Sequence, residues 1–358
     1  MKKETSDRFY TEMAALARRK KIPSRVMFEL TYKCNFRCVH CYVSADNKKK
    51  ELTTKEVFSV LDQLKDAGCF NIGFTGGEPL LRKDIFDILE HAKRCGLRIS
   101  LLTNGYLVDK STARKLASLG TSLNRVDISV LGATGKTFEN ITGAKGSFNR
   151  VMNSIKLLKR EGAAVQVKAT LMGPNKDELL GIKYLADKFG CFFRYDPTIS
   201  RRTDGSSVPL QYQVSPDEVF RIERLLAGDK QAVDDHEDGY RRGIPKPQGR
   251  KALFHCGAGQ TEVTISPYGE MNFCMEIHYP EYKIQETSFE HCWGKLRNLV
   301  ENIKLPKKYE CKTCEIASFC HWCPAKAWLL KKDLFSCDPE SKRFALAQAK
   351  VSSVNLQK

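Results

Sequence analysis

Short apolar runs alternate with stretches of helical periodicity over the first 200 residues of the chain. The apolar runs predict six β-strands, at residues 25–31, 70–75, 97–103, 125–131, 164–172 and 191–195. The stretches between them predict helices at residues 54–67, 85–95, 111–119, 148–161 and 176–189. Strands that alternate with helices favour an α/β fold with a parallel sheet, either open or curled into a partial (β/α)6 TIM-like barrel. In such folds the chemistry lies at the carboxyl ends of the strands.

This alternation ends after Asp196. Residues 197–216 are polar and irregular, residues 215–227 have a helical pattern, and residues 228–250 are polar enough to predict a linker. The segment that follows is dense in cysteine and has little periodicity, which indicates a second unit organised by metal. We therefore expect an N-terminal extension, a barrel, a bridging region, a small cysteine-rich domain and a C-terminal helix or tail, at residues 1–24, 25–197, 198–254, 255–340 and 341–358.

Composition excludes several classes of protein. With 42% hydrophobic and 28% charged residues, the chain of 358 residues is not disordered as a whole. Its first 21 residues carry charges throughout and lack the apolar segment of a signal peptide, and no run approaches the roughly 18 apolar residues of a membrane helix. We therefore expect a cytoplasmic protein without a membrane partner. The net charge of +17 is scattered, as on a solvated surface, although an acidic peptide or a nucleic acid remains an alternative partner.

Three of the fourteen cysteines lie just after the first predicted strand, with the spacing Cys34-x3-Cys38-x2-Cys41. A short loop of this kind can wrap three thiolates around one face of a [4Fe–4S] cluster, and the fourth iron then stays open to a ligand. Zinc with His40 as a fourth ligand is the alternative. Because His40 is adjacent to Cys41, the two residues are poorly placed for the same tetrahedron.

Seven further cysteines lie in the C-terminal part of the chain: Cys256, Cys274, Cys311, Cys314, Cys320, Cys323 and Cys337. A hairpin with its turn at residues 266–269 is expected between the first two. A zinc ribbon needs roughly 15–20 residues between its C-x2-C pairs, far more than separate Cys314 from Cys320, so cluster binding is favoured. The remaining cysteines, which lie in apolar elements, are expected to be small buried side chains: Cys69, Cys95, Cys191 and Cys292.

A second motif, Thr75-Gly76-Gly77-Glu78-Pro79, follows the second predicted strand. Glycines allow the backbone to approach a ligand closely. The carboxylate of Glu78 can accept a charge-assisted hydrogen bond from an ammonium group. By contrast, the P-loop-like segment at residues 132–137 lacks the glycine that a Walker A motif would need at Val130, so binding of a nucleoside triphosphate is not expected.

With both motifs in this order, the sequence resembles the radical S-adenosylmethionine (radical SAM) superfamily. The resemblance implies a cluster on Cys34, Cys38 and Cys41 whose open iron chelates the amino and carboxylate groups of S-adenosylmethionine. One electron then cleaves the cofactor, and the 5′-deoxyadenosyl radical abstracts a hydrogen atom from a substrate. Other residues that the resemblance places near the cofactor are Tyr42, Gly76, Gly77, Glu78, Thr103, Asn104, Ser129 and Arg150. The last four also have purely structural interpretations: Thr103 and Asn104 in a turn formed by Asn-Gly, Ser129 as a strand-end serine, and Arg150 in a surface salt bridge.

The C-terminal cysteines resemble those of the SPASM subgroup, which holds two auxiliary [4Fe–4S] clusters. The resemblance assigns Cys256, Cys274 and Cys323 to the first cluster. It assigns a full set of four to the second: Cys311, Cys314, Cys320 and Cys337. Some members carry one more cysteine shortly after the first, but Glu262 and its neighbours offer none. The first auxiliary cluster would then have an open iron or a ligand other than cysteine, and a protein with a single auxiliary cluster is the alternative.

This resemblance implies a radical SAM oxidoreductase that matures a ribosomally made precursor peptide by cross-linking, epimerisation or oxidation. The implied partners are the peptide or protein substrate, an electron donor such as flavodoxin or ferredoxin and, because only about 24 residues precede the first strand, a separate leader-recognition protein. Tyr195 and Asp196, at the end of the sixth strand, are candidates for an acid or base. The alternatives are an enzyme that modifies a tetrapyrrole or RNA, and an iron–sulfur or zinc binding module without catalysis.

Overall fold

The structure is a computed structural model that describes residues 12, 15–44, 49–228, 253–254 and 256–355. Within these residues one nine-stranded sheet has the order β6-β5-β4-β3-β2-β1-β7-β8-β9. Its strands are β1 (Arg25–Thr31), β2 (Asn71–Gly76), β3 (Arg98–Thr103), β4 (Leu123–Ser129), β5 (Val165–Thr170), β6 (Phe192–Asp196), β7 (Glu262–Ile265), β8 (Glu270–Asn272) and β9 (Tyr282–Lys283).

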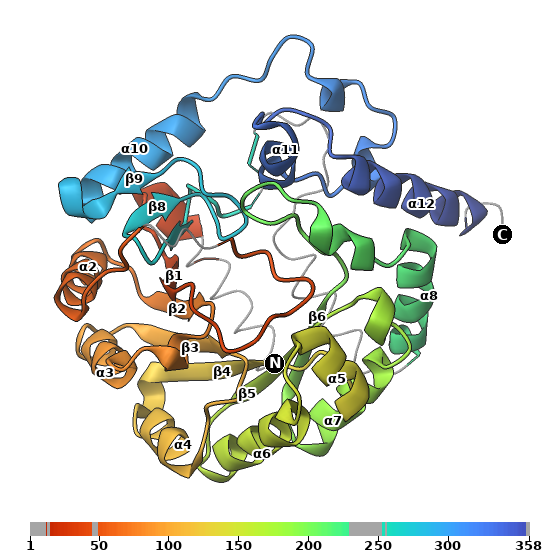
Figure 1. Cartoon of the computed structure of the whole chain (residues 1–358). Coiled ribbons are helices and arrows are strands. Elements are labelled where there is room, and N and C mark those ends of the chain that lie inside the picture. Colours follow the sequence, from red (N-terminus) through yellow and green to blue (C-terminus); the bar gives the residue numbers. More distant parts are fainter. Residues whose placement is uncertain (1–11, 13–14, 45–48, 229–252, 255, 356–358) are drawn as a thin grey trace.

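Strands β1 to β6 are parallel neighbours that curve into a partial barrel, with helices around the outside (Figure 1). These helices are α2 (Thr54–Asp66), α3 (Ile85–Arg94), α4 (Lys110–Ala117), α5 (Gly135–Thr142), α6 (Ser147–Arg160) and α7 (Leu179–Lys188). The predicted partial (β/α)6 barrel is therefore confirmed. All six strands and five of these helices lie where the sequence predicts them, whereas α5 was not predicted.

Local sequence signals explain several helix boundaries. At the start of α2, Glu56 N donates to Thr53 Oγ1 (3.4 Å) and Thr53 N donates to Glu56 Oε2 (2.7 Å), which forms a capping box. After α3, Gly96 has a φ of +75°, a conformation that favours glycine and ends the helix.

The P-loop-like segment at residues 132–137 forms the start of α5, and a side chain of the protein occupies the anion site at this helix start. The carboxylate of Glu178 accepts hydrogen bonds from Ala133 N (2.7 Å), Thr134 N (3.1 Å) and the Thr137 hydroxyl (2.5 Å). A carboxylate of the protein itself thus takes the place that a phosphate would occupy at a helix N-terminus.

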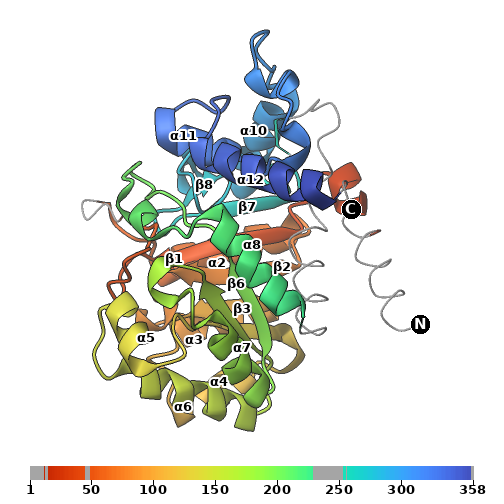
Figure 2. The same cartoon turned by 90° about the vertical axis from the view of Figure 1, so that its right-hand side faces the viewer.

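The C-terminal region continues the barrel sheet. Strand β7 pairs in parallel with β1, from Arg25 opposite Glu262 to Phe28 opposite Ile265, and β8 turns back against β7 as the predicted hairpin. Helices α10 (Phe289–Asn302), α11 (Pro324–Lys331) and α12 (Pro339–Asn355) lie together on this side of the molecule (Figure 2). The predicted helix at 215–227 is α8 (Pro216–Ala227), whereas most of the predicted linker lies outside the described residues. Among the described helices, none has the length and apolar character that crossing a membrane requires.

Candidate functional site

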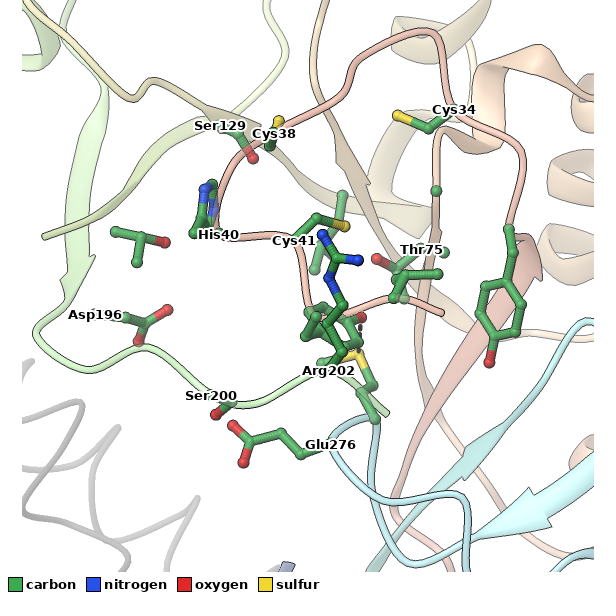
Figure 3. Close-up of a pocket in the computed structure, with 18 of the residues that line it drawn as sticks. Cys34, Cys38, His40, Cys41, Thr75, Ser129, Asp196, Ser200, Arg202 and Glu276 are labelled. Atoms are coloured by element: carbon green, nitrogen blue, oxygen red, sulfur yellow. Dashed lines mark hydrogen bonds between the residues drawn. The ribbon is translucent and has the colours of Figure 1, made fainter. Parts of the chain in front are cut away.

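A cavity of about 2180 Å³ opens at the carboxyl ends of the barrel strands. Its lining comes from two distant parts of the chain, the loops after the barrel strands and the cysteine-rich C-terminal region. Figure 3 shows the portion around the first cysteine loop, where polar groups from several strand ends point toward one space. The expected location of the chemistry is therefore an actual hollow in the fold.

The loop after β1 brings Cys34, Cys38 and Cys41 to the border of this cavity (Figure 3). Arg37 N donates to Thr142 O at the end of α5 (2.9 Å), and Cys41 N donates to Cys38 O (3.1 Å). The first hydrogen bond fastens the loop to the barrel and the second closes a turn between two of the cysteines. All three side chains are half-buried.

The three thiols influence one another. Burial raises the pKa of each, and that of Cys38 reaches about 12 because Cys41 and Cys34 raise it further. Arg202 and Arg37 act in the opposite direction on Cys41. Three adjacent thiolates in a poorly solvated place need a cation to stabilise them, and bound iron supplies that charge.

The donor set fits a [4Fe–4S] cluster with one open iron. Three cysteines share one border of the cavity, and Cys34 Sγ accepts from Phe36 N (3.4 Å) and from Asn104 Nδ2 (3.9 Å). Hydrogen bonds to the sulfur ligands are one of the protein's means of tuning such a cluster. The loop could therefore hold this group and leave one iron facing the cavity.

His40, the alternative zinc ligand, also borders the cavity. Burial and, to a smaller extent, the charge of Lys168 lower the pKa of its imidazole to about 4, so the ring is neutral at physiological pH. Its Nδ1 is buried and has no hydrogen-bond partner among the described residues. His40 thus presents a neutral nitrogen to the cavity.

A compact group of possible metal ligands lies elsewhere, between α2 and α3. In the part of the chain that the structure describes, Asp62, His91 and Cys95 are the one such group whose ligand atoms all lie within 4.8 Å of one another. A hydrogen bond between His91 Nε2 and Asp62 Oδ1 (2.7 Å) accounts for much of this closeness. This group does not contribute to the cavity.

The glycines of the second motif bring the end of β2 against the start of the cysteine loop. A Cβ atom on Gly76, whose φ is +131°, would lie 2.1 Å from Thr31 O, and one on Gly77 would lie 2.2 Å from Lys33 O. Only glycine fits at these two positions. Both glycines border the cavity, as predicted for residues whose backbone approaches a ligand.

Glu78 differs from its neighbours because its side chain is fully buried and lies outside the cavity lining. Its carboxylate accepts hydrogen bonds from Thr103 Oγ1 (2.8 Å), Asn104 N (2.7 Å) and Leu80 N (3.0 Å). Burial raises the pKa of this carboxyl to about 7. In the structure Glu78 joins the ends of β2 and β3. Its direct contact with an ammonium group stays a prediction.

Four other predicted cofactor contacts reach the cavity: Tyr42, Thr103, Asn104 and Ser129. Asn104 and Ser129 lie at the carboxyl ends of adjacent strands, β3 and β4. The Asn104 amide donates to Asn35 Oδ1 (2.8 Å), which ties the end of β3 to the cysteine loop. Ser129 and Cys38 both border the cavity, and both are labelled in Figure 3.

Arg150 is not brought to the cavity. Its side chain is exposed at the start of α6, its Nε donates to Tyr106 O (2.7 Å), and its guanidinium lies 4.3 Å from the centre of the Tyr106 ring. The contact with the aromatic ring holds the cation on the outer surface. The structure shows this contact with Tyr106 in place of the surface salt bridge expected as the structural alternative, and the carboxylate contact of Arg150 stays a prediction.

The two acid–base candidates point to opposite faces of β6, since successive side chains in a strand alternate. Asp196 borders the cavity and pairs with Lys168 Nζ (3.1 Å). Tyr195 is buried on the outer face, where burial and the neighbouring Glu223 raise the pKa of its hydroxyl. Of the two candidates, only Asp196 borders the cavity.

The first group of C-terminal cysteines lies on the far side of the cavity from the barrel loops. Cys256 and Cys323 border the cavity, and Cys274 lies beside them at the end of the β7–β8 hairpin. Burial raises the pKa of Cys274 well above its usual range, and Glu276, Cys323 and Cys256 raise it further. These mutual effects place the three thiols in one cluster of side chains.

A second group lies between the 3-10 turns that precede α11 and the start of α12. Burial raises the pKa of Cys337, and Cys311 and Cys314 are among the groups that raise it further. Cys320 borders the cavity, and its thiol donates to Ser341 O (3.9 Å). The assignment of these cysteines to two auxiliary clusters stays a prediction.

Sequence reasoning did not find the polar network beneath the cysteine loop. Glu29, whose side chain is fully buried in β1, accepts hydrogen bonds from the hydroxyls of Tyr32 (2.9 Å) and Tyr42 (3.2 Å). The Tyr32 oxygen also lies 3.0 Å from His278 Nε2, in the C-terminal region. A charged residue in the otherwise apolar run RVMFELT was the available signal. The network fixes Tyr42, and hence the end of the cysteine loop.

Glu29 predicts a pH dependence of stability. Burial raises the pKa of its carboxyl from 4.5 to about 7, so the folded protein keeps a proton that the unfolded chain releases. Stability is highest below pH 4.5 for this group and falls by about 3 kcal/mol as the pH rises to about 7. Glu78 has the same raised pKa and contributes a similar pH dependence. Glu29→Gln should therefore reduce the change in melting temperature between about pH 5 and pH 8 to about half of that in the parent. The exposed Glu290→Gln is the matched control, and an unchanged slope in Glu29→Gln would contradict the assignment.

Comparison with known proteins agrees with this geometry. The family model of the radical SAM superfamily matches residues 28–182. The AdoMet-dependent heme synthase of Methanosarcina barkeri is 26% identical, over 88% of this chain and 95% of the synthase. The mycofactocin maturase MftC of Mycolicibacterium smegmatis is 25% identical, over 89% of this chain and 82% of the maturase.

Among solved structures, Streptococcus suis SuiB bound to the precursor peptide SuiA has the same fold, with a TM-score of 0.71 at 14% identity over 92% of this chain and 79% of SuiB. The family match covers the cysteine loop, the Gly-Gly-Glu motif and strands β2 to β5, and it ends before β6. The chain therefore carries a domain of the radical SAM superfamily.

Proposed function

We propose that this protein is a radical SAM enzyme that abstracts a hydrogen atom from a peptide or protein substrate. The observation that carries the proposal is the shared cavity, which is bordered by Cys34, Cys38 and Cys41 and by cysteines of the C-terminal region. In this proposal residues 25–197 form the radical SAM barrel and residues 255–340 an auxiliary-cluster domain. The two units would share one reaction space.

A [4Fe–4S] cluster on the first cysteine loop would supply the electron and the open iron that reductive cleavage of S-adenosylmethionine requires. The chain's own residues would orient that cofactor. Gly76 and Gly77, at the end of β2, present backbone groups at the cavity border. Ser129, at the end of β4, presents a hydroxyl there. The Asn104 amide would fix the position of the loop and the cofactor together.

We further propose that the two C-terminal cysteine groups hold auxiliary [4Fe–4S] clusters. Cys256, Cys274 and Cys323 would hold the cluster nearer the cavity. Four cysteines would complete the other: Cys311, Cys314, Cys320 and Cys337. Such clusters could accept the electron that remains on an oxidised product, with flavodoxin or ferredoxin as the donor for the first cluster. Measurement of the iron and sulfide content per chain would distinguish a protein with two auxiliary clusters from a protein with one.

The size and charge of the cavity support a peptide substrate. A cavity of about 2180 Å³ exceeds the roughly 300–1,000 Å³ of common small-molecule pockets, so a cofactor and a peptide segment could share it. Its border includes Lys168, Arg202 and Lys326, which would attract an acidic segment. The similarity to MftC, a maturase, and to SuiB, whose structure contains a precursor peptide, supports the same substrate class. A separate protein could recognise the leader.

A tetrapyrrole substrate is the second candidate. The similarity to the heme synthase of Methanosarcina barkeri covers 95% of that protein, more than the 82% covered of MftC. The same cationic residues could bind the propionate groups of a porphyrin. Charge alone does not separate these two substrates.

The test is an anaerobic assay of the reconstituted protein with S-adenosylmethionine and dithionite. We expect 5′-deoxyadenosine to form, and a precursor peptide encoded near the gene to lose hydrogen, as measured by mass spectrometry. Iron-coproporphyrin takes the place of the peptide in a parallel reaction, and a mass change of the porphyrin alone would favour the second candidate. Absence of 5′-deoxyadenosine from cluster-loaded protein would overturn the proposal of a radical enzyme.

A further inference from the structure

A [4Fe–4S] cluster needs four ligands, and the group nearer the cavity provides three cysteines. We propose that the carboxylate of Glu276 is the fourth ligand of the auxiliary cluster held by Cys256, Cys274 and Cys323. This inference rests on the proposed function, since it presumes that these cysteines hold a cluster.

The backbone places Glu276 beside one of the cysteines. Ile277 N donates to Cys274 O (3.3 Å), and these two residues form an isolated antiparallel bridge. Glu276 therefore lies inside a tight turn, two residues after Cys274. Its side chain borders the same cavity as Cys256 and Cys323, and the close-up shows its carboxylate facing that space (Figure 3).

The cavity brings Glu276 together with cysteines that are distant from it in the sequence. Glu276 lines the cavity with Cys256 and Cys323, and it follows Cys274 within one turn. Its carboxylate therefore borders the same space as the group of three cysteines, which is the position that a fourth ligand takes.

The charge balance of this place calls for a cation. The Glu276 carboxylate is half-buried and makes no hydrogen bond or ion pair among the described residues. Three thiolates and a carboxylate would repel one another, and Lys326, a cation that borders the same cavity, adds only one positive charge. Iron ions among these groups would stabilise all four, and a carboxylate oxygen is an ordinary ligand for iron.

A second glutamate near the group provides the matched control. Glu262 raises the pKa of Cys256, but its side chain is exposed at the start of β7 and lies 3.8 Å from Arg25 NH1 on β1. Its carboxylate thus has a partner, and Glu262 does not belong to the cavity lining. Glu262→Ala should leave the cluster unchanged.

The experiment isolates the auxiliary clusters in a Cys34→Ala/Cys38→Ala/Cys41→Ala background. In that background we would prepare Glu276→Ala, Glu276→Cys and Glu262→Ala, reconstitute them with 57Fe, and record iron content, Mössbauer spectra and EPR spectra with and without added cyanide. We expect Glu276→Ala to acquire an open iron, seen as a cyanide-dependent change in the EPR spectrum or as loss of about one iron to a three-iron form. Glu276→Cys should keep all its iron with altered spectra and no response to cyanide.

The outcomes separate this inference from the proposed function. Spectra of Glu276→Ala and Glu276→Cys that match the parent, with and without cyanide, would overturn the inference and leave the auxiliary cluster in place. If Glu262→Ala responds to cyanide and Glu276→Ala does not, Glu262 is the ligand, and this result would also overturn the inference. If the parent background binds no iron, the proposed auxiliary clusters themselves fail.

Discussion

Replacement of Cys34, Cys38 and Cys41 by alanine is expected to remove about four irons per chain and to reduce cleavage of S-adenosylmethionine to the uncatalysed background. The three residues share one cavity border, and no other cysteine belongs to their loop. Because the C-terminal cysteines form separate groups, the remaining iron should stay bound. Iron and sulfide assays on anaerobically reconstituted protein, with 5′-deoxyadenosine measured by chromatography, provide the test.

Cys69→Ala is the matched control for this experiment. Cys69 is buried in the core at the start of β2, and its thiol donates to Asn71 O (3.4 Å). Its removal should cost about 1 kcal/mol in the free energy of unfolding and no iron. Equal iron in the triple variant and the parent would show that the first loop holds no cluster, and loss of iron in Cys69→Ala would show that iron content reports on folding alone.

The barrel could be predicted from the sequence because its signals are local. Each strand is a short apolar run and each covering helix has one apolar face, so the pattern defines both within a few residues. The first strand matches residue for residue, at Arg25–Thr31. The attachment of β7 to β1 could not be predicted in this way, because it pairs residues more than 230 positions apart in the chain.

Two helices of the C-terminal region, α10 and α11, were not predicted. They lie among cysteines, and the cysteine spacing there indicates metal ligands more strongly than the apolar positions indicate a helix. α5 was missed because its first residues imitate a P-loop, and the structure shows that Glu178 satisfies the start of that helix. Tertiary contacts, not local propensity, decide such short elements.

Some features of the candidate site could also be predicted from the sequence, and others could not. Cysteine spacing and paired glycines could be recognised because their chemistry depends on residue type and order. Side-chain direction could not, and it places Tyr195 and Asp196 on opposite faces of one strand. Glu276 was also missed, since nothing in the sequence shows that it borders the same cavity as the distant Cys256 and Cys323.

Glu78→Ala is expected to lower the free energy of unfolding by about 3 kcal/mol and to weaken binding of S-adenosylmethionine at least tenfold. The substitution leaves three buried donors without an acceptor, on Thr103, Asn104 and Leu80. It also frees Asn104, whose amide donates to Asn35 Oδ1 (2.8 Å) and holds the cysteine loop. Urea denaturation and equilibrium binding of the cofactor measure the two effects.

Glu78→Gln and Thr103→Val separate this positioning role from a direct contact. Glutamine keeps an acceptor but loses one of the three hydrogen bonds, and Thr103→Val removes one donor and leaves the carboxylate in place. If Glu78 acts by joining β2 to β3, both variants should lose about 1 kcal/mol of stability, and cofactor affinity should fall in proportion. If Glu78 instead binds the ammonium group directly, Glu78→Gln should lose affinity at unchanged stability, and Thr103→Val should retain the affinity of the parent. The second result would contradict the buried, fully bonded carboxylate that the structure shows.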